Sequence, residues 1–253
     1  MPSGKTAINC DNCSSMWKVN DATHCWSLTG KQAPQPPDCP AKVYSEIIDK
    51  AFVEYSGKSE VAQISKAATK TEGLCYYRDE NGKAKAPRWT RVESTIAFAK
   101  IMGYKKIGIA SCISLLIETK QLSLILEKQG FELSIVTCKA GSIDKTKMGF
   151  GERCKINPGT HEPICNPIAQ ARIFNKQKTD MNIILGLCVG HDMLFSMHSK
   201  APVTTLVVKD RVTGHNPIVV LHGQNYHYKR LQNEPVLDEK DLTCQESIIT
   251  DES

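Results

Sequence analysis

The sequence lacks the features of secreted and membrane proteins. No apolar stretch of the kind found in a secretory signal follows its first residues. No segment approaches the roughly 18 consecutive apolar residues that span a membrane. The longest apolar runs, residues 107–110 and 183–189, have the length of buried strands. We therefore expect a soluble, cytoplasmic protein with no membrane partner.

Motifs of several well-known protein classes are also missing. The chain contains no GxGxxG, P-loop, HExxH or GxSxG motif, so nothing indicates a nucleotide cofactor, a zincin or an α/β-hydrolase. No basic run is interleaved with aromatic residues, which argues against a nucleic-acid partner. No internal repeat is visible.

Cysteine is too scarce for a disulfide scaffold, where it would exceed roughly 8–10% of a short chain. The 11 cysteines among 253 residues are still too many to ignore, and their odd number excludes complete pairing within the chain. Because thiols stay reduced in the cytoplasm, we expect clustered cysteines to be metal ligands or catalytic groups.

Charge is unevenly distributed along the chain. Residues 234–253 carry seven acids and one base, a net charge of −6. Since the whole chain carries +5, the remaining residues carry +11. A basic body attracts anions, which favours a small anionic substrate, although scattered lysines also fit an ordinary solvated surface. The acidic end is expected to be a flexible tail.

The chain divides into four predicted segments. A Cys-rich arm ends in a proline-rich linker, and a helical segment follows in which apolar residues recur at three- and four-residue spacing. An α/β domain and the acidic tail complete the chain. These segments are residues 1–40, 41–84, 85–233 and 234–253.

The third segment alternates apolar strands with helices, a pattern typical of an open, mostly parallel sheet covered by helices on both faces. Helix ends are marked by Gly103, Gly130 and the Asn166-Pro167 pair, with Asn166 as N-cap. The expected strands are residues 106–110, 133–137, 181–187 and 203–208. The expected helices are residues 92–102 and 114–128, and two more that begin at Asn166-Pro167 and after Gly190.

Four cysteines fall where this sheet would bind a ligand. Cys112, Cys138 and Cys188 follow the first three predicted strands, and Cys165 precedes a helix; ligands of open α/β sheets bind at the carboxyl ends of the strands. Thiolates select zinc or iron–sulfur clusters, and helix N-termini favour them. Three ligands would leave an open metal position, and four would close it. The alternative is that these cysteines are small buried apolar residues.

A second group of cysteines lies in the N-terminal arm. Cys10 and Cys13 form a CxxC pair, and Cys25 and Cys39 follow it. A segment without its own core needs something to order it, and a four-cysteine zinc site is the simplest solution, with His24 as a possible substitute ligand. An iron–sulfur cluster is the alternative metal, and an unordered arm with reactive thiols is the alternative without metal.

Two histidines also lie at predicted strand ends. His191, beside Asp192, and His215 are placed to act as general acids or bases. Each could instead be a hydrogen-bonded structural histidine. Cys75, Cys154 and Cys244 have no clear role.

Over roughly residues 85–230 the sequence resembles the domain of unknown function 1847 family, whose members are described as metal-binding. The resemblance implies a cysteine-rich metalloprotein of anaerobes and archaea with no settled reaction. It supports Cys112, Cys138, Cys165, Cys188 and His191 as site residues. The family tends to open with a compact cysteine cluster, whereas the third and fourth N-terminal cysteines of this chain, Cys25 and Cys39, are widely spaced. The stretches that carry the resemblance include RWTRVE (88–93), MGYKKIGIA (102–110), CKAGSI (138–143), CNPIAQA (165–171) and LCVGHD (187–192).

Together these patterns predict an iron–sulfur protein, most simply with a 4Fe-4S cluster on the four strand-end cysteines. It would be a redox enzyme or lyase acting on a small anionic substrate, with His191 or His215 moving protons. A zinc-binding non-catalytic protein is one alternative. An iron–sulfur electron carrier that docks to a redox partner protein is the other.

Overall fold

The computed structural model describes residues 10, 37 and 39–237. The chain divides into two compact units, Met1–Lys70 and Thr71–Ser253. The two units are described separately below.

The first unit contains α1 (Pro40–Val43), α2 (Ser45–Glu54) and most of α3 (Glu60–Leu74). α2 forms where the three- and four-residue spacing of apolar side chains predicts a helix. None of its residues is buried, and Ile47 and Phe52 are largely exposed. The periodic pattern thus determines the helix here without burying its apolar face.

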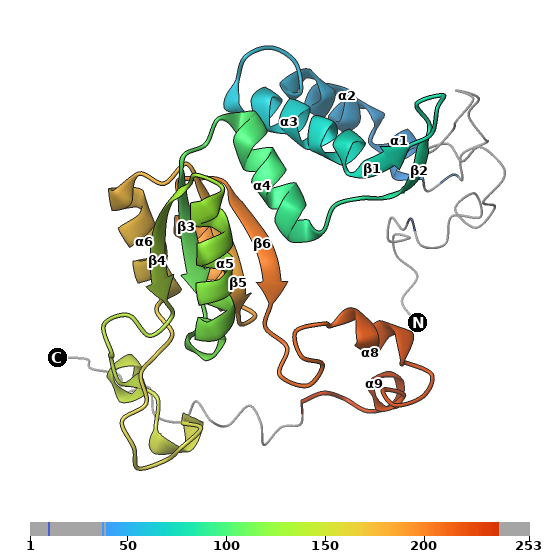
Figure 1. Cartoon of the computed structure of the whole chain (residues 1–253). Coiled ribbons are helices and arrows are strands. Elements are labelled where there is room, and N and C mark those ends of the chain that lie inside the picture. Colours follow the sequence, from blue (N-terminus) through green and yellow to red (C-terminus); the bar gives the residue numbers. More distant parts are fainter. Residues whose placement is uncertain (1–9, 11–36, 38, 238–253) are drawn as a thin grey trace. The chain divides into compact units, whose positions relative to one another are not determined.

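The second unit is built on a four-stranded parallel sheet, which confirms the predicted α/β fold (Figure 1). The strand order is β4-β3-β5-β6, so that β3 and β5 lie at the centre. Ile109 of β3 is paired with Ile135 of β4 on one side and with Ile183 of β5 on the other. The bounds are β3 (Lys106–Ser111), β4 (Glu132–Thr137), β5 (Met181–Leu187) and β6 (Val203–Val208).

Helices cover both faces of this sheet. Alternate residues of a strand point to opposite faces, and β3 accordingly places Ile107 and Ile109 in one core and Ala110 in the other. The first core packs against α4 (Arg91–Met102) and α5 (Leu116–Lys128), and the second against α6 (Pro167–Gln177) and α7 (His191–His198). Each large side chain buried in these cores contributes about 1.5–3 kcal/mol.

β5 changes face near its end. Gly186 adopts a φ of +74°, and the pairing with β6 shifts register between Leu185 and Leu187. Leu185 therefore lies in the first core and Leu187 in the second. A Cβ atom on Gly186 would lie 2.1 Å from Cδ1 of Leu115, so this position requires glycine for space as well as for conformation.

The helix boundaries follow the signals in the sequence. Thr90 and Glu93 form a capping box at the start of α4, and Gly103 ends that helix in the left-handed conformation. Asn166 caps α6 by accepting a hydrogen bond from Ala169 N–H. These local rules explain why the helices begin and end where the sequence predicts.

Other elements were not predicted. The polar stretch around Asn81-Gly82 forms the turn of a hairpin between β1 (Tyr76–Arg78) and β2 (Ala84–Pro87). Short helices also occur: η1 (Ile113–Leu115), η2 (Lys145–Met148), η3 (Glu152–Cys154), α8 (Ile218–His222) and α9 (Arg230–Asn233).

Within the described residues, no helix is long and apolar enough to cross a membrane.

Candidate functional site

Three of the four predicted cysteines meet at the carboxyl end of the sheet. Cys112 follows β3, Cys138 follows β4, and Cys165 precedes the N-cap of α6. The side chains of Cys112 and Cys165 lie close enough to the Cys138 thiol to raise its pKa. The Cys138 sulfur accepts a hydrogen bond from Ile113 N–H at 3.4 Å. Cys138 is therefore the centre of a three-thiol group.

Backbone hydrogen bonds fix this group. Cys112 N–H donates to the Leu185 carbonyl (3.1 Å) and Cys138 N–H to the Ser111 carbonyl (2.8 Å), which extend the sheet pairing just past the strand ends. Asn166 N–H donates to the Cys138 carbonyl at 2.7 Å and ties the start of α6 to the end of β4. The thiols are consequently positioned by the fold itself, as a preorganised site requires.

Gln170 is a positioning residue that the sequence reasoning missed. Its fully buried side chain donates through Nε2 to the carbonyls of Ser111 (3.2 Å) and Val136 (2.7 Å), and so bridges the ends of β3 and β4. Among the described residues, Gln170 Oε1 and Ser111 Oγ have no hydrogen-bond partner. A polar residue one turn after Pro167, on the buried face of α6, was the available signal.

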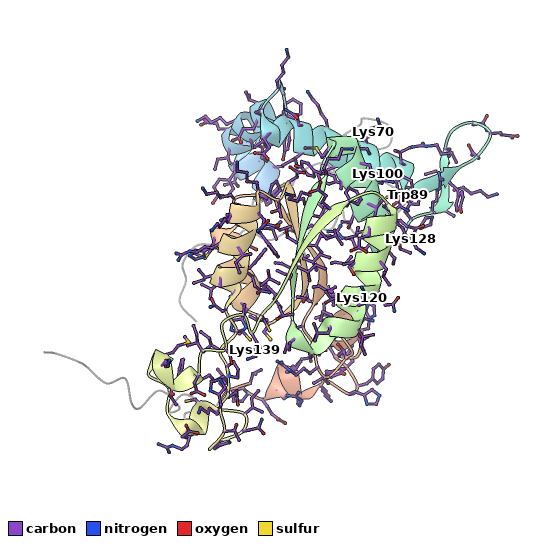
Figure 2. All side chains as sticks on the ribbon, turned by 60° about the vertical axis from the view of Figure 1, so that its left-hand side comes forward. Lys70, Trp89, Lys100, Lys120, Lys128 and Lys139 are labelled. Atoms are coloured by element: carbon purple, nitrogen blue, oxygen red, sulfur yellow. The ribbon has the colours of Figure 1, made fainter. Side chains whose placement is uncertain are left out.

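Two lysines surround the thiols with positive charge. Lys209 Nζ donates to Ser114 Oγ (2.5 Å), and Ser114 Oγ lies 3.3 Å from Cys112 Sγ. Lys139 Nζ donates to the Pro163 carbonyl, and Figure 2 shows Lys139 at the end of the sheet toward which the strands run. Positive charge therefore lies beside the thiols of Cys112 and Cys165.

The hydrogen bonds and charges separate the pKa values of the three thiols. The hydrogen bond from Cys138 lowers the pKa of Cys112 well below its ordinary value of 9.0, and Ser114 and Lys209 lower it further. The Cys138 hydrogen bond likewise lowers the pKa of Cys165, with help from the charge of Lys139. The pKa of Cys138 is raised because the neighbouring Cys112 and Cys165 side chains favour its protonated form.

Cys188 and His191 lie beside this group. Cys188 is half-buried, and its sulfur accepts a hydrogen bond from Arg211 Nη2 at 3.4 Å. Within the part of the chain that the structure describes, no hydrogen bond joins Cys188 to the other three cysteines. His191 begins α7, and its charge lowers the pKa of Cys165. Its buried Nδ1 has no hydrogen-bond partner among the described residues.

His215 closes a tight loop. Its N–H donates to the Asp210 carbonyl (2.8 Å), and its Nδ1 accepts from Asp210 N–H (3.0 Å). Its φ of +69° is unusual for a residue other than glycine. Nδ1 is thus already engaged, and a role in proton transfer stays a prediction.

The predicted N-terminal metal site falls largely outside the described residues. Cys13, Cys25 and His24 are not among them, whereas Cys10 is exposed and Cys39 is the N-cap of α1. Among described side chains, no three Cys, His, Asp or Glu groups are arranged to hold one metal ion as they stand.

At the strand ends, the chemistry of the donor set fits a thiolate-bound group. Three sulfurs are the ligands that zinc and iron–sulfur clusters prefer. Two cations balance the negative charge of such a group, and the orphaned Nδ1 of His191 can donate or accept a proton there.

Comparison with known proteins places this site in a family. The model of the family described as protein of unknown function (DUF1847) matches residues 39–206, in agreement with the resemblance seen in the sequence. An uncharacterized protein of Methanocaldococcus jannaschii is 43% identical over 197 residues, which cover 78% of this chain and 92% of that protein. No solved structure matches the chain.

Proposed function

The chain belongs to the DUF1847 family, and we propose that it is a metal-binding protein whose Cys112, Cys138 and Cys165 hold an iron–sulfur cluster. One observation carries this proposal: three cysteines gather at the carboxyl end of a parallel sheet, where Ile113 N–H, next to Cys112, bonds Cys138 Sγ and Asn166 N–H, next to Cys165, bonds the Cys138 carbonyl. Sites of this kind bind ligands in open α/β folds.

Like-charge repulsion explains why the three thiols need a cation. Without one, Cys138 keeps its proton and lets Cys112 and Cys165 ionise beside it. A metal deprotonates a coordinating thiol outright, so it would replace the Cys138 proton and bring all three sulfurs to the thiolate state. The arrangement is therefore poised for a soft metal.

The finer form of the proposal is a redox enzyme or lyase acting on a small anionic substrate. A cluster held by three cysteines supplies one iron with an open position for substrate. Lys139 and Lys209 would attract and orient the anion. His191 is better placed than His215 to move a proton, because its buried Nδ1 is unpaired among the described residues whereas that of His215 is engaged.

A zinc-binding, non-catalytic protein is the second candidate. The closeness of the three cysteines favours it, since sulfurs that bind one tetrahedral Zn²⁺ at about 2.3 Å lie close to one another. The third candidate is an electron carrier, in which Cys188 would complete a closed set of four ligands.

Anaerobic purification followed by iron, sulfide and zinc analysis tests the proposal. We expect a brown protein that loses iron and sulfide in each of Cys112→Ser, Cys138→Ser and Cys165→Ser. Cys75→Ser is the matched control, because Cys75 is half-buried like Cys165 and its thiol is hydrogen-bonded to Ser94 Oγ at 3.2 Å.

Three outcomes separate the candidates. A colourless protein that binds only zinc at these cysteines would establish the second candidate. Unchanged metal content in all three variants would refute a strand-end centre. Loss of the cluster in Cys188→Ser as well would favour the electron carrier, whereas retention would favour the open, enzymatic form.

A further inference from the structure

The long loop between Cys138 and Cys165 contains a second constellation, independent of the thiols. Ser142 Oγ lies 3.1 Å from Nε2 of His161, and Nδ1 of the same imidazole lies 3.3 Å from Oδ2 of Asp144. A hydroxyl, an imidazole and a carboxylate in this order are the parts of a nucleophilic serine triad, which is recognised by geometry rather than by sequence position.

Hydrogen bonds within the loop fix the three residues relative to one another. Ile164 N–H donates to the Ile143 carbonyl at 2.7 Å, and an isolated β-bridge pairs Asp144 with Pro163. Asp144 Oδ2 also accepts a hydrogen bond from Glu162 N–H at 2.8 Å. The segment that carries the serine is thereby fixed against the segment that carries the histidine.

The carboxylate selects the tautomer that the serine needs. Hydrogen bonds from Thr146 lower the pKa of Asp144 well below its ordinary value, so the group is ionised and keeps the imidazole proton on Nδ1 of His161. Nε2 then accepts a hydrogen bond from the Ser142 hydroxyl. The Ser142 carbonyl also lies 3.1 Å from Nε2. With a proton held on Nδ1, Nε2 can donate a hydrogen bond to this carbonyl only when both ring nitrogens are protonated.

The backbone of Ser142 is strained, as is common at functional sites. Its φ is +46°, in the left-handed region that residues other than glycine rarely occupy, and such strain gathers at functional sites. The residue is exposed, so that its hydroxyl can reach a substrate. The residue after such a nucleophile commonly supplies an oxyanion donor, which is here the N–H of Ile143.

We propose that Ser142, His161 and Asp144 form an acyl-transfer site that hydrolyses small esters. Ser142 Oγ forms a bond to the carbonyl carbon, and its proton passes to Nε2 of His161. The ester C–O bond breaks, and the leaving alcohol takes that proton. Water then attacks the acyl carbon and gives one proton to His161. The Oγ–C bond breaks, His161 returns that proton to Ser142 Oγ, and the acid leaves.

A fluorophosphonate probe tests the site without a known substrate. Attack by Ser142 would form an Oγ–P bond and expel fluoride, and peptide mass spectrometry locates the label. We expect the label on Ser142 of the wild-type chain and its absence in Ser142→Ala. If the probe labels only other serines of the wild-type chain, or no serine, the proposal is wrong. This outcome does not depend on whether any variant folds.

The role of the base is tested by the labelling rate. General bases contribute about 10²–10⁴-fold, so His161→Gln should slow labelling of Ser142 by about 100-fold or more. His198→Gln is the matched control, because the His198 ring bonds the Leu194 carbonyl of its own helix, α7, at 2.8 Å. Equal rates in His161→Gln and wild type would show a structural clip instead of a triad. Circular dichroism verifies that both variants fold, and the cysteines stay intact, so metal binding is assessed separately.

Discussion

The thiol site and the loop of residues 139–166 are adjacent in sequence, yet they are held together by different forces. Backbone hydrogen bonds between buried strands and α6 position the three thiols. The loop is organised by Lys155, which is only 8% exposed and whose Nζ contacts Asp144 (3.1 Å) and Glu152 (2.8 Å). Packing therefore stabilises the thiol site, and ion pairing stabilises the loop. Substitutions that disturb packing should affect the first region most, and changes in charge should affect the second.

Ion pairing in the loop shifts the pKa values of Lys155 and Glu152. The hydrogen bond to Glu152 is the main cause that raises the pKa of Lys155, and the same bond lowers the pKa of Glu152. Lys155 Nζ also donates to the Thr160 carbonyl at 2.9 Å. A buried amine thus replaces the apolar core that a loop of this length does not have.

The largest contrast should come from adding one methyl group to each region. Gly186→Ala would place a Cβ 2.1 Å from Leu115 Cδ1 at a φ of +74°, and we expect it to lower the free energy of unfolding by about 3–4 kcal/mol. Gly149→Ala, in the loop, has a φ of +82° but meets no atom within 4 Å, so about 1 kcal/mol is expected. Urea unfolding measures both, and equal losses would show that packing does not set the two regions apart.

A smaller loss is expected from the buried amide. Gln170→Leu leaves the carbonyls of Ser111 and Val136 without their side-chain donor, which should cost about 2 kcal/mol. Gln129→Leu is the matched control, since Gln129 is exposed and bonds only Lys100 through its side chain, and about 0.5 kcal/mol or less is expected. Equal urea midpoints for the two variants would contradict a bridging role for Gln170.

The main architecture could be predicted because it depends on local, apolar signals. Runs such as residues 183–187 are apolar throughout, as buried parallel strands are, and Gly103 and Asn166 mark helix ends by their own backbone and side-chain chemistry. The hairpin of β1 and β2 was missed because its strands are exposed and carry no two-residue alternation. Pairing across a turn, rather than burial, forms it.

The site was predictable only in part, for a related reason. Strand ends could be counted, so Cys112, Cys138, Cys165 and Cys188 were expected at one rim; Cys112 and Cys138 do follow β3 and β4 directly. Contacts among side chains distant in sequence carry no periodic signal, so the pairing of Lys209 with Ser114, and that of Ser142 with His161, could not be predicted.

Acid should produce the smallest effect, confined to the loop. The folded pKa of Asp144 lies below its ordinary value of 3.8, so its stabilising contribution is complete above that pH and is lost as the pH falls through the folded pKa. Hydrogen exchange read by mass spectrometry should show Thr146 and Glu162 amides losing protection between about pH 5 and pH 2. The Cys138 amide, bonded to a carbonyl, is the internal control; if it loses protection in parallel, the two regions are not independent.

The hydrogen bond from Asn166 N–H to the Cys138 carbonyl has a consequence for chain length. Because it closes the loop at its base, together with the Lys139 contact to Pro163, the residues between can change in number without moving the cysteines. Each doubling of such a loop costs only about 0.6 kcal/mol in closure entropy. Insertions or deletions between these contacts therefore leave the three-thiol group in place. New functional residues can arise in this loop without displacing the cysteines.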